Sequence, residues 1–202
     1  MTASLKLEHV VLEGEFVRLE PLTLAHEADL ARAAADGELW NTDVTIIPKP
    51  DGMKSYIEAA LKGFELGFEL PFAIIQKTDS PQVVGTTRFY EVFSKDLKAA
   101  IGYTWIGKSA QRTAVNTEAK LLLLRHAFER WKCVRVELIT DVLNEQSRAA
   151  ILRLGAKQEG VLRKHLILPS GRVRDSVVYS IIDTEWPEVK ASLLNRLRRS
   201  SL

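Results

Sequence analysis

Residues 99–131 read AAIGYTWIGKSAQRTAVNTEAKLLLLRHAFERW, and this stretch determines the fold class. Residues 99–107 have the composition of a strand, whereas apolar residues from 113 onward recur about a turn apart and predict a helix over 113–131. The polar segment 109–120 carries the chain from the strand into the helix. A loop in this place presents free backbone N–H groups and the positive end of the helix dipole, which together suit a phosphate or pyrophosphate.

This loop has two interpretations. Arg112 can add a charge-assisted contact to a bound phosphate. In an ordinary helix start, Thr113 or Asn116 would instead do no more than cap the backbone. The fingerprints GxGxxG and GxxxxGK[ST] are absent from the segment, so local physics alone does not name an anion.

The rest of the chain predicts a mixed sheet with helices. In chain order we expect a strand at 15–20, helices at 24–37 and 52–66, strands at 71–77, 82–93 and 99–107, the helix at 113–131, a strand at 134–141, a helix at 144–155, a hairpin of 156–169 with 172–182, and a terminal helix at about 184–199. This order is typical of an α+β (α/β) fold with a mostly antiparallel sheet of about seven strands, not of a doubly wound dinucleotide fold. No repeat or linker divides the chain, so residues 1–202 are expected to form a single domain.

Composition fits an ordinary soluble domain. The 28 Lys and Arg against 26 Asp and Glu leave a net charge of +2, too small a surplus to predict nucleic-acid binding. Cys133 is the single cysteine, which excludes a disulfide scaffold and suits a reducing cytosol. No stretch has the pattern of a signal peptide or the length of a membrane span, so we expect a cytoplasmic protein without a membrane partner.

The loop resembles the acyl-CoA loop of the GNAT superfamily of N-acyltransferases, whose pattern is Q/R-x-x-G-x-G/A. Ala114 and Asn116 stand at its two small-residue positions and depart from glycine. The resemblance implies the GNAT fold and acetyl-CoA, or another short acyl-CoA, as cosubstrate. It implies that the strand before the loop pairs with pantetheine through its backbone, which also polarises the thioester carbonyl. The implied CoA-binding residues are Tyr103, Thr104, Trp105, Ile106, Gln111, Arg112, Thr113, Ala114, Val115, Asn116, Thr117, Asn144 and Ser147.

Two later runs resemble the RimJ/RimL branch of this superfamily, which acetylates protein N-terminal amines and related substrates. Residues 144–163 follow N-x-x-S … L-G-F/A … E-G-x-L-R, and residues 171–180 follow G-R-x-R-D-x-V-x-Y-S. The GNAT-like pattern covers about residues 13–186. It implies direct transfer of an acetyl group to a primary amine, either a protein N-terminus or a small molecule, in a ternary complex.

The leaving thiolate needs a hydrogen-bond partner. Many relatives have a tyrosine seven residues after the asparagine of the second motif, where this chain has Ile151, which cannot donate a proton. The resemblance then implies Ser147, whose alternative role is to satisfy nearby helix backbone. Asn144 can cap its helix, bind pantetheine, or do both.

The general base is also atypical. Relatives often carry a glutamate where this chain has Ala100, so Glu91 is the first candidate. Glu137 and Asp141 remain possible, and each of the three carboxylates can instead be solvated or salt-bridged. A water chain can replace a dedicated base.

Trp40, Phe68 and Phe72 belong to the region that shapes the acceptor pocket in this branch, although core packing is the ordinary role of such side chains. The four histidines lack metal-site spacing, so no metal is expected. Relatives are often dimers, which leaves a homodimer possible. The alternatives are a CoA-binding module without turnover, a succinyl-CoA-type acyltransferase, and a nucleotide- or nucleic-acid-binding domain.

Overall fold

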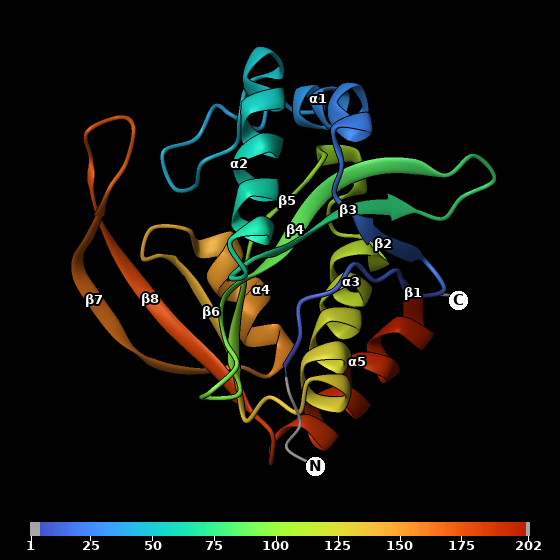
Figure 1. Ribbon diagram of the computed structural model, residues 1–202, viewed down its shortest axis with the longest axis vertical. Helices are drawn as coiled ribbons and strands as arrows, with labels where there is room; N and C mark the ends of the chain where they lie inside the picture. The colour runs from blue at the N-terminus through green and yellow to red at the C-terminus, as the bar shows by residue number, and fades with distance from the viewer. Residues whose placement is uncertain (1–4, 201–202) are drawn as a thin grey trace.

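One mixed sheet of eight strands organises the protein. The computed structural model describes residues 5–200 (Figure 1). The strand order is β1-β2-β3-β4-β5-β6-β8-β7, with β5 and β6 parallel and the other neighbours antiparallel. The strands are β1 (Leu12–Glu13), β2 (Val17–Pro21), β3 (Leu70–Gln76), β4 (Gln82–Phe93), β5 (Lys98–Ile106), β6 (Arg135–Asp141), β7 (Lys157–Ile167) and β8 (Val173–Ile182).

Helices cover both faces of this sheet. They are α1 (Glu27–Ala35), α2 (Met53–Glu65), α3 (Ala114–Arg125), α4 (Glu145–Leu154) and α5 (Trp186–Ser200). Short turns of other helix types are η1 (Leu24–His26), η2 (Pro50–Gly52), η3 (Lys108–Ala110) and η4 (His126–Arg130). Among the described residues, no helix is long and apolar enough to cross a membrane.

Two hydrophobic clusters show which helices share a face. On β3, Phe72 and Ile74 belong to the larger cluster with residues of α3, α4 and α5, whereas Ala73 and Ile75 belong to the smaller cluster with α1 and α2. Alternate residues of a strand point to opposite sides, so these clusters define an α3 face and an α2 face of the sheet. Figure 1 shows α3 lying beside α5, with α1 and α2 together at the other end of the molecule.

Local signals account for most elements. Thr113 accepts a hydrogen bond from the Val115 N–H at the start of α3. Gly155 ends α4 in the left-handed region with φ 97°. The expected stripe of the 113–131 helix is confirmed, because Leu121, Leu124, Ala127, Phe128 and Trp131 are all buried. This helix is α3 followed by the single π-helical turn η4.

The mostly antiparallel sheet of about seven strands expected from the sequence is confirmed, with an eighth strand added because the two-residue β1 pairs with β2. One predicted helix needs correction. The helix expected at 24–37 is a 3-10 turn followed by the shorter α1. Leu24 is 43% exposed, because it lies in the 3-10 turn, whose shorter period points its side chain outward.

Candidate active site

The sheet opens between β5 and β6. These strands pair only where Lys98–Ala100 lie beside Arg135–Glu137. Beyond this point β5 continues to Ile106 while β6 stays paired with β8 on its other side. One edge of β5 therefore presents backbone donors and acceptors to an opening, where an extended ligand can add as a strand does.

A β-bulge lies in the same part of β5. Tyr103 and Thr104 together oppose the single residue Thr87 of β4. Tyr103 has a φ of 49°, in the left-handed region that non-glycine residues rarely occupy. A bulge bends the strand and re-aims its backbone groups, so the open edge of β5 is shaped and not simply extended.

The loop that follows β5 ends in a well-formed helix start. Thr113 caps α3, and Arg112 holds the loop's left-handed conformation with φ 61°. Ala114 and Asn116, the two residues that depart from glycine, lie inside the helix. Neither therefore needs glycine's conformational freedom. The first turn of α3 has N–H groups without a partner inside the helix, apart from that of Val115, which donates to Thr113.

The starts of α3 and α4 lie next to each other. Gln111 donates from Nε2 to the Ile106 carbonyl at 2.9 Å, and its Oε1 lies 3.3 Å from Gln146 Nε2 on α4. Asn144 caps α4, since its Oδ1 accepts from the Ser147 N–H at 3.0 Å. The capping role expected for Asn144 is thus confirmed. Ser147 is partly exposed beside the loop.

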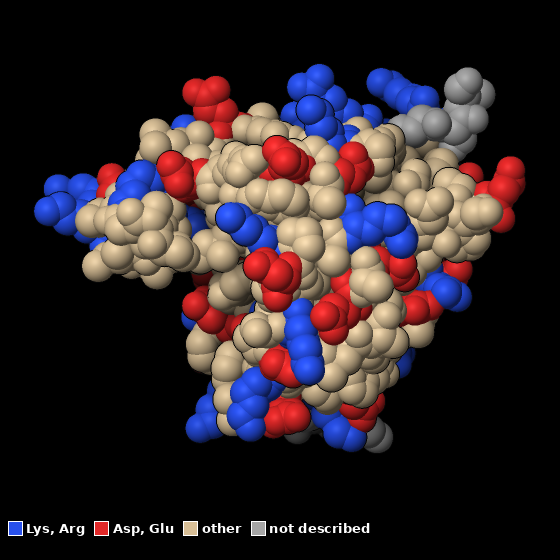
Figure 2. Space-filling model, turned by 90° about the horizontal axis from the view of Figure 1, so that it is seen from above, with Lys and Arg blue, Asp and Glu red and all other residues tan. Residues whose placement is uncertain are grey.

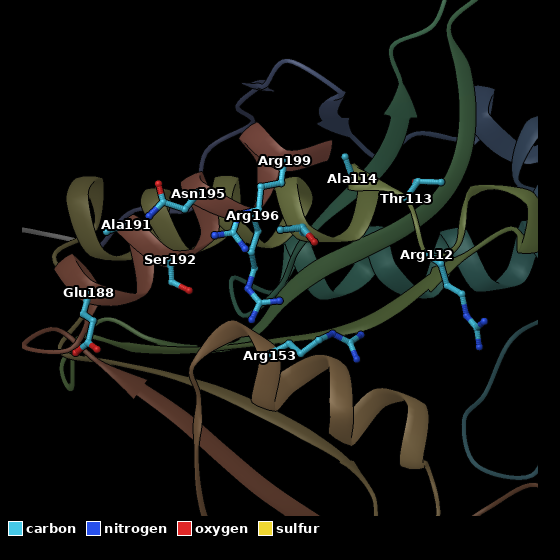
Figure 3. A pocket seen from close by; sticks show the side chains of 11 residues that line it. Arg112, Thr113, Ala114, Arg153, Glu188, Ala191, Ser192, Asn195, Arg196 and Arg199 are labelled. Carbon is cyan, nitrogen blue, oxygen red and sulfur yellow. The ribbon is translucent and has the colours of Figure 1, made fainter. Parts of the chain in front are cut away.

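A basic groove of about 1320 Å³ runs from this loop along α5. Figure 3 shows side chains from α3, α4 and α5 around it. Its cations are Arg112 of the loop, Arg153 of α4, and Arg196 and Arg199 of α5, with Glu188 as the acidic lining residue. Over the face seen in Figure 2, by contrast, acidic and basic side chains are interspersed. The groove can accept an anion without a basic surface elsewhere.

Sequence reasoning missed this use of α5. In a sequence, arginines near the C-terminus of a helix are ordinarily explained by the helix dipole, which they stabilise. Arg196 and Arg199 are three residues apart and therefore share a side of the helix, which was the one available signal. Their neighbour Arg153 belongs to another helix, so no local pattern could join them.

The α2 face of the opening carries aromatic and charged side chains. The guanidinium of Arg88 lies 4.2 Å from the centroid of the Tyr103 ring, and the same residue forms a buried ion pair with Glu69 at 2.7 Å. The Tyr90 and Tyr103 rings meet edge to face, 5.3 Å apart. Burial raises the pKa of Tyr90, and the nearby Glu91 carboxylate raises it further. Tyr90 therefore stays a neutral phenol beside Glu91.

The three candidate carboxylates differ in their surroundings. Asp141 is fully buried and ion-paired with Arg172 of the β7–β8 hairpin. Glu137 accepts from Arg135 Nε at 2.9 Å. Glu91 is exposed at a second irregularity of β4, with φ 48°, and no ion pair to another described residue involves its carboxylate. Of the three, Glu91 is the most available to accept a proton.

The three aromatic residues expected near the acceptor pocket have different outcomes. Phe72 is 0% exposed in the core of the α3 face, packed edge-on against Phe89 at 6.4 Å, so the prediction that it binds substrate is wrong. The physical reason is strand alternation, which turns Phe72 away from the α2 face. Trp40 is partly buried against the cluster of the α2 face and stays a prediction. Phe68 is 43% exposed just before β3.

The sequence predicts no metal site, because the histidines lack the spacing of metal ligands. Within residues 5–200, no three histidine, cysteine, aspartate or glutamate side chains gather as a metal site would require. Cys133 is buried, and burial raises the pKa of its thiol to about 12. Cys133 therefore acts as a small buried hydrophobe.

Comparison with known proteins decides the family. The model of the acetyltransferase (GNAT) domain matches residues 17–157. The chain belongs to the GNAT acetyltransferase family. It is therefore an acetyl-CoA-dependent N-acetyltransferase, and its sheet is the α+β GNAT sheet, here with eight strands.

Individual GNAT relatives agree with this assignment. The chain is 33% identical over 142 residues to YdaF of Bacillus subtilis (strain 168), provisionally named a ribosomal N-acetyltransferase, with 70% of this chain and 69% of YdaF covered. A provisionally named acetyltransferase structure from T. thermophilus is 36% identical with a TM-score of 0.83, covering 95% and 98% of the two chains. Mycobacterium smegmatis RimJ, solved with CoA-disulfide, shares the fold at 23% identity with a TM-score of 0.76, covering 93% and 92%. The RimJ/RimL-like branch expected from the motifs is confirmed.

Proposed function

We propose that this enzyme transfers an acetyl group from acetyl-CoA to a primary amine, either a protein N-terminal α-amine or the amine of a small molecule, by direct attack in a ternary complex. The observation that carries the proposal is the opening between β5 and β6, whose free strand edge leads directly to the start of α3. The name of YdaF favours a ribosomal protein as one source of the amine.

Acetyl-CoA lies across the opening in this proposal. Its pantetheine adds to the edge of β5 formed by Tyr103, Thr104, Trp105 and Ile106, and its pyrophosphate meets the N–H groups of residues 111–117. The remaining phosphate and the adenosine extend into the groove lined by Arg112, Arg153 and Arg199. Four arginines against one glutamate give this groove the positive charge that the phosphates of acetyl-CoA require.

The thioester sits at the bulge of β5. A backbone N–H of Tyr103–Trp105 donates to its carbonyl oxygen and stabilises the negative charge that develops there as the amine attacks. The C–N bond forms, the C–S bond breaks, and CoA leaves as a thiolate. Ser147 donates its hydroxyl hydrogen to the sulfur, because Ile151 has no proton to give. Asn144 holds the start of α4 in place and hydrogen-bonds pantetheine.

The amine approaches from the α2 face. Glu91 accepts its proton, directly or through water, because this carboxylate is exposed beside Tyr90 and Tyr103. Trp40 borders the acceptor pocket from the loop between α1 and α2. Arg172 connects this loop to the β7–β8 hairpin by donating to the Asp43 carbonyl, so both segments form one wall.

The wider organisation follows the same proposal. Residues 1–202 form a single GNAT domain, which is supported by one continuous sheet and by α5 packing on α3. The protein acts in the cytoplasm and needs no metal. Homodimer formation would be measured by light scattering.

The first experiment separates binding from turnover. Thermal unfolding is followed with CoA, acetyl-CoA, succinyl-CoA, NAD and ATP, and thiol release is then measured on a panel of amines that includes N-terminal peptides. CoA at 100 times its dissociation constant should stabilise the protein by about 2.7 kcal/mol. A shift with NAD or ATP but none with CoA would refute the proposal. A CoA shift without thiol release would favour a binding module, and faster release from succinyl-CoA would favour the succinyl enzyme.

Matched variants then test the residues. Arg153→Gln should weaken CoA binding by about tenfold, whereas Arg32→Gln, an exposed change on α1, should not. Ser147→Ala and Glu91→Gln should lower kcat about 10- to 1000-fold with little change in the dissociation constant of CoA. If Ser147→Ala turns over at the wild-type rate, the serine has no role at the sulfur.

A further inference from the structure

A buried lysine lies under the bulge of β5. Lys120 projects from α3 and is 6% exposed. Its Nζ lies 2.6 Å from the Thr104 hydroxyl and 3.3 Å from the Thr87 hydroxyl. The two hydroxyls are 2.7 Å apart. One amine and two threonines thus form a closed hydrogen-bonded group on the α3 face, and we name it the Lys120 triad.

The surroundings favour a neutral amine. Burial alone lowers the pKa of Lys120 from 10.5 to about 7, and among the described residues no carboxylate forms an ion pair with it. The carboxylate of Glu118, two positions earlier, accepts hydrogen bonds from the backbone N–H groups of Glu15, Phe16 and Val17. A lysine kept in such a place without a counter-charge is rare in proteins, and its hydrogen bonds are the stabilising contacts it has.

The triad meets the sheet at the bulge itself. Thr104 is one of the two bulged residues, and Thr87 is the residue of β4 that opposes them. The Thr104 hydroxyl also donates to the Gly102 carbonyl at 3.2 Å, and this hydrogen bond joins the two residues that flank Tyr103. The triad therefore joins α3, β4 and β5 at one point.

The bulge needs such support. Tyr103 occupies the left-handed region with φ 49°, and unfavourable backbone conformations persist where their surroundings determine them. On the α2 face Tyr103 is held by Arg88. On the α3 face, Lys120 hydrogen-bonds Thr104, the residue that follows Tyr103. Both sides of the bulge are thereby fixed.

We propose that Lys120 is a positioning residue for acetyl transfer: through the hydroxyls of Thr104 and Thr87, its amine holds the bulge so that a backbone N–H of Tyr103–Trp105 is aimed at the thioester carbonyl. This rests on the proposed function, which places the thioester at the bulge. Lys120 itself touches neither acetyl-CoA nor the acceptor. A misalignment of about 1 Å can lower the rate about 100-fold. Removing the Lys120 amine should therefore lower kcat and leave substrate binding largely unchanged.

The test compares isosteric variants. Thr104→Val removes the hydroxyl at nearly constant shape, Thr104→Ser keeps the hydroxyl, and Lys120→Met keeps the length of the side chain without the amine. We expect Thr104→Val and Lys120→Met each to lose about 10- to 100-fold in kcat with the KM for acetyl-CoA within about twofold, and Thr104→Ser, which keeps the hydroxyl, to lose clearly less kcat than Thr104→Val. Lys54→Met on the exposed side of α2 is the matched control.

The double variant separates positioning from packing. If Lys120 acts through Thr104, adding Lys120→Met to Thr104→Val should cost no further activity, whereas independent packing defects would multiply. Multiplying losses, equal losses in Thr104→Ser and Thr104→Val, or a loss confined to KM would each overturn the inference. If Lys120→Met does not fold, the Thr104 pair decides the question.

A second readout does not depend on turnover. The backbone amide resonances of Tyr103, Thr104 and Trp105 should shift in Lys120→Met and stay unchanged in Lys54→Met. Unchanged resonances in Lys120→Met overturn the inference whatever the activity. A wild-type protein without thiol release, in which these resonances nevertheless respond, refutes the proposed function and leaves the support of the bulge by Lys120 intact.

Discussion

Lys120 should make the stability of this protein depend on pH in a range where most proteins show little change. Its pKa is about 7 in the folded protein because burial disfavours the ammonium, against 10.5 for an exposed lysine. Between these values the unfolded chain binds the proton and the folded protein does not. The free energy of unfolding therefore rises with pH from about 7 to about 10.5, and the full cost of burial is present below about pH 7.

The magnitude follows from the size of the shift. A difference of about 3.5 pKa units at 1.36 kcal/mol per unit gives about 5 kcal/mol over the whole range, as an upper value. From pH 7 to pH 9 the expected gain is about 2 to 3 kcal/mol. Lys120→Met should lose this slope and be more stable than wild type at pH 7, because a thioether needs no water.

Guanidinium unfolding at pH 7, 8 and 9, followed by tryptophan fluorescence, measures the effect. The quantity compared is the difference between wild type and Lys120→Met, since the buried Cys133 and Tyr90 titrate alike in both. Lys54→Met should keep the wild-type slope. Parallel curves for wild type and Lys120→Met would refute the reasoning, because they would mean that Lys120 is charged or hydrated in the folded protein.

Three further results are expected. Glu118→Ala should destabilise by about 3 kcal/mol or more in urea unfolding, because three backbone N–H groups donate to its carboxylate at 2.6–2.8 Å; a loss below about 1 kcal/mol would contradict this. Gly85→Ala should lower the thermal midpoint, since an added Cβ would lie 2.1 Å from the Trp105 carbonyl oxygen, and an unchanged midpoint would refute this contact. Burial lowers the pKa of His126 to about 4 from 6.5, so stability should fall as pH drops from about 6.5 to about 4, and His126→Leu should flatten this fall; equal acid slopes would count against it.

Local signals explain why so much of the fold could be predicted. Helix starts and ends depend on residues within four positions, so Thr113, Asn144 and Gly155 identified the limits of α3 and α4. The same holds for the loop proposed to bind CoA, because its place between a strand and a helix can be recognised along the chain. The prediction of the first helix was wrong at its start, because Leu24 begins a 3-10 turn, which has fewer residues per turn than an α-helix.

The candidate site was predictable only in part. Its loop and strand are contiguous in the chain, and the structure places Gln111 beside Gln146 of α4 and Arg112 in the lining of the basic groove. Phe72 was assigned to the wrong side, because a strand buried on both faces gives no alternation to show which face a residue takes. Arg153 and Arg199 came together only through the packing of α5 on α3 and α4.

The order of residues along the chain was enough for the family, the α+β class and the strand–loop–helix that we propose binds acyl-CoA, because each is encoded in neighbouring residues. Packing was needed to show the gap between β5 and β6, the insertion of β8 between β6 and β7, and the partners of Lys120. Lys120 looks like an ordinary helix lysine in the sequence. Its low pKa and its contact with the bulge depend on residues of β5 and β4 that lie 16 and 33 positions away in the chain. Contacts over that distance cannot be recognised from the residues next to Lys120 in the sequence.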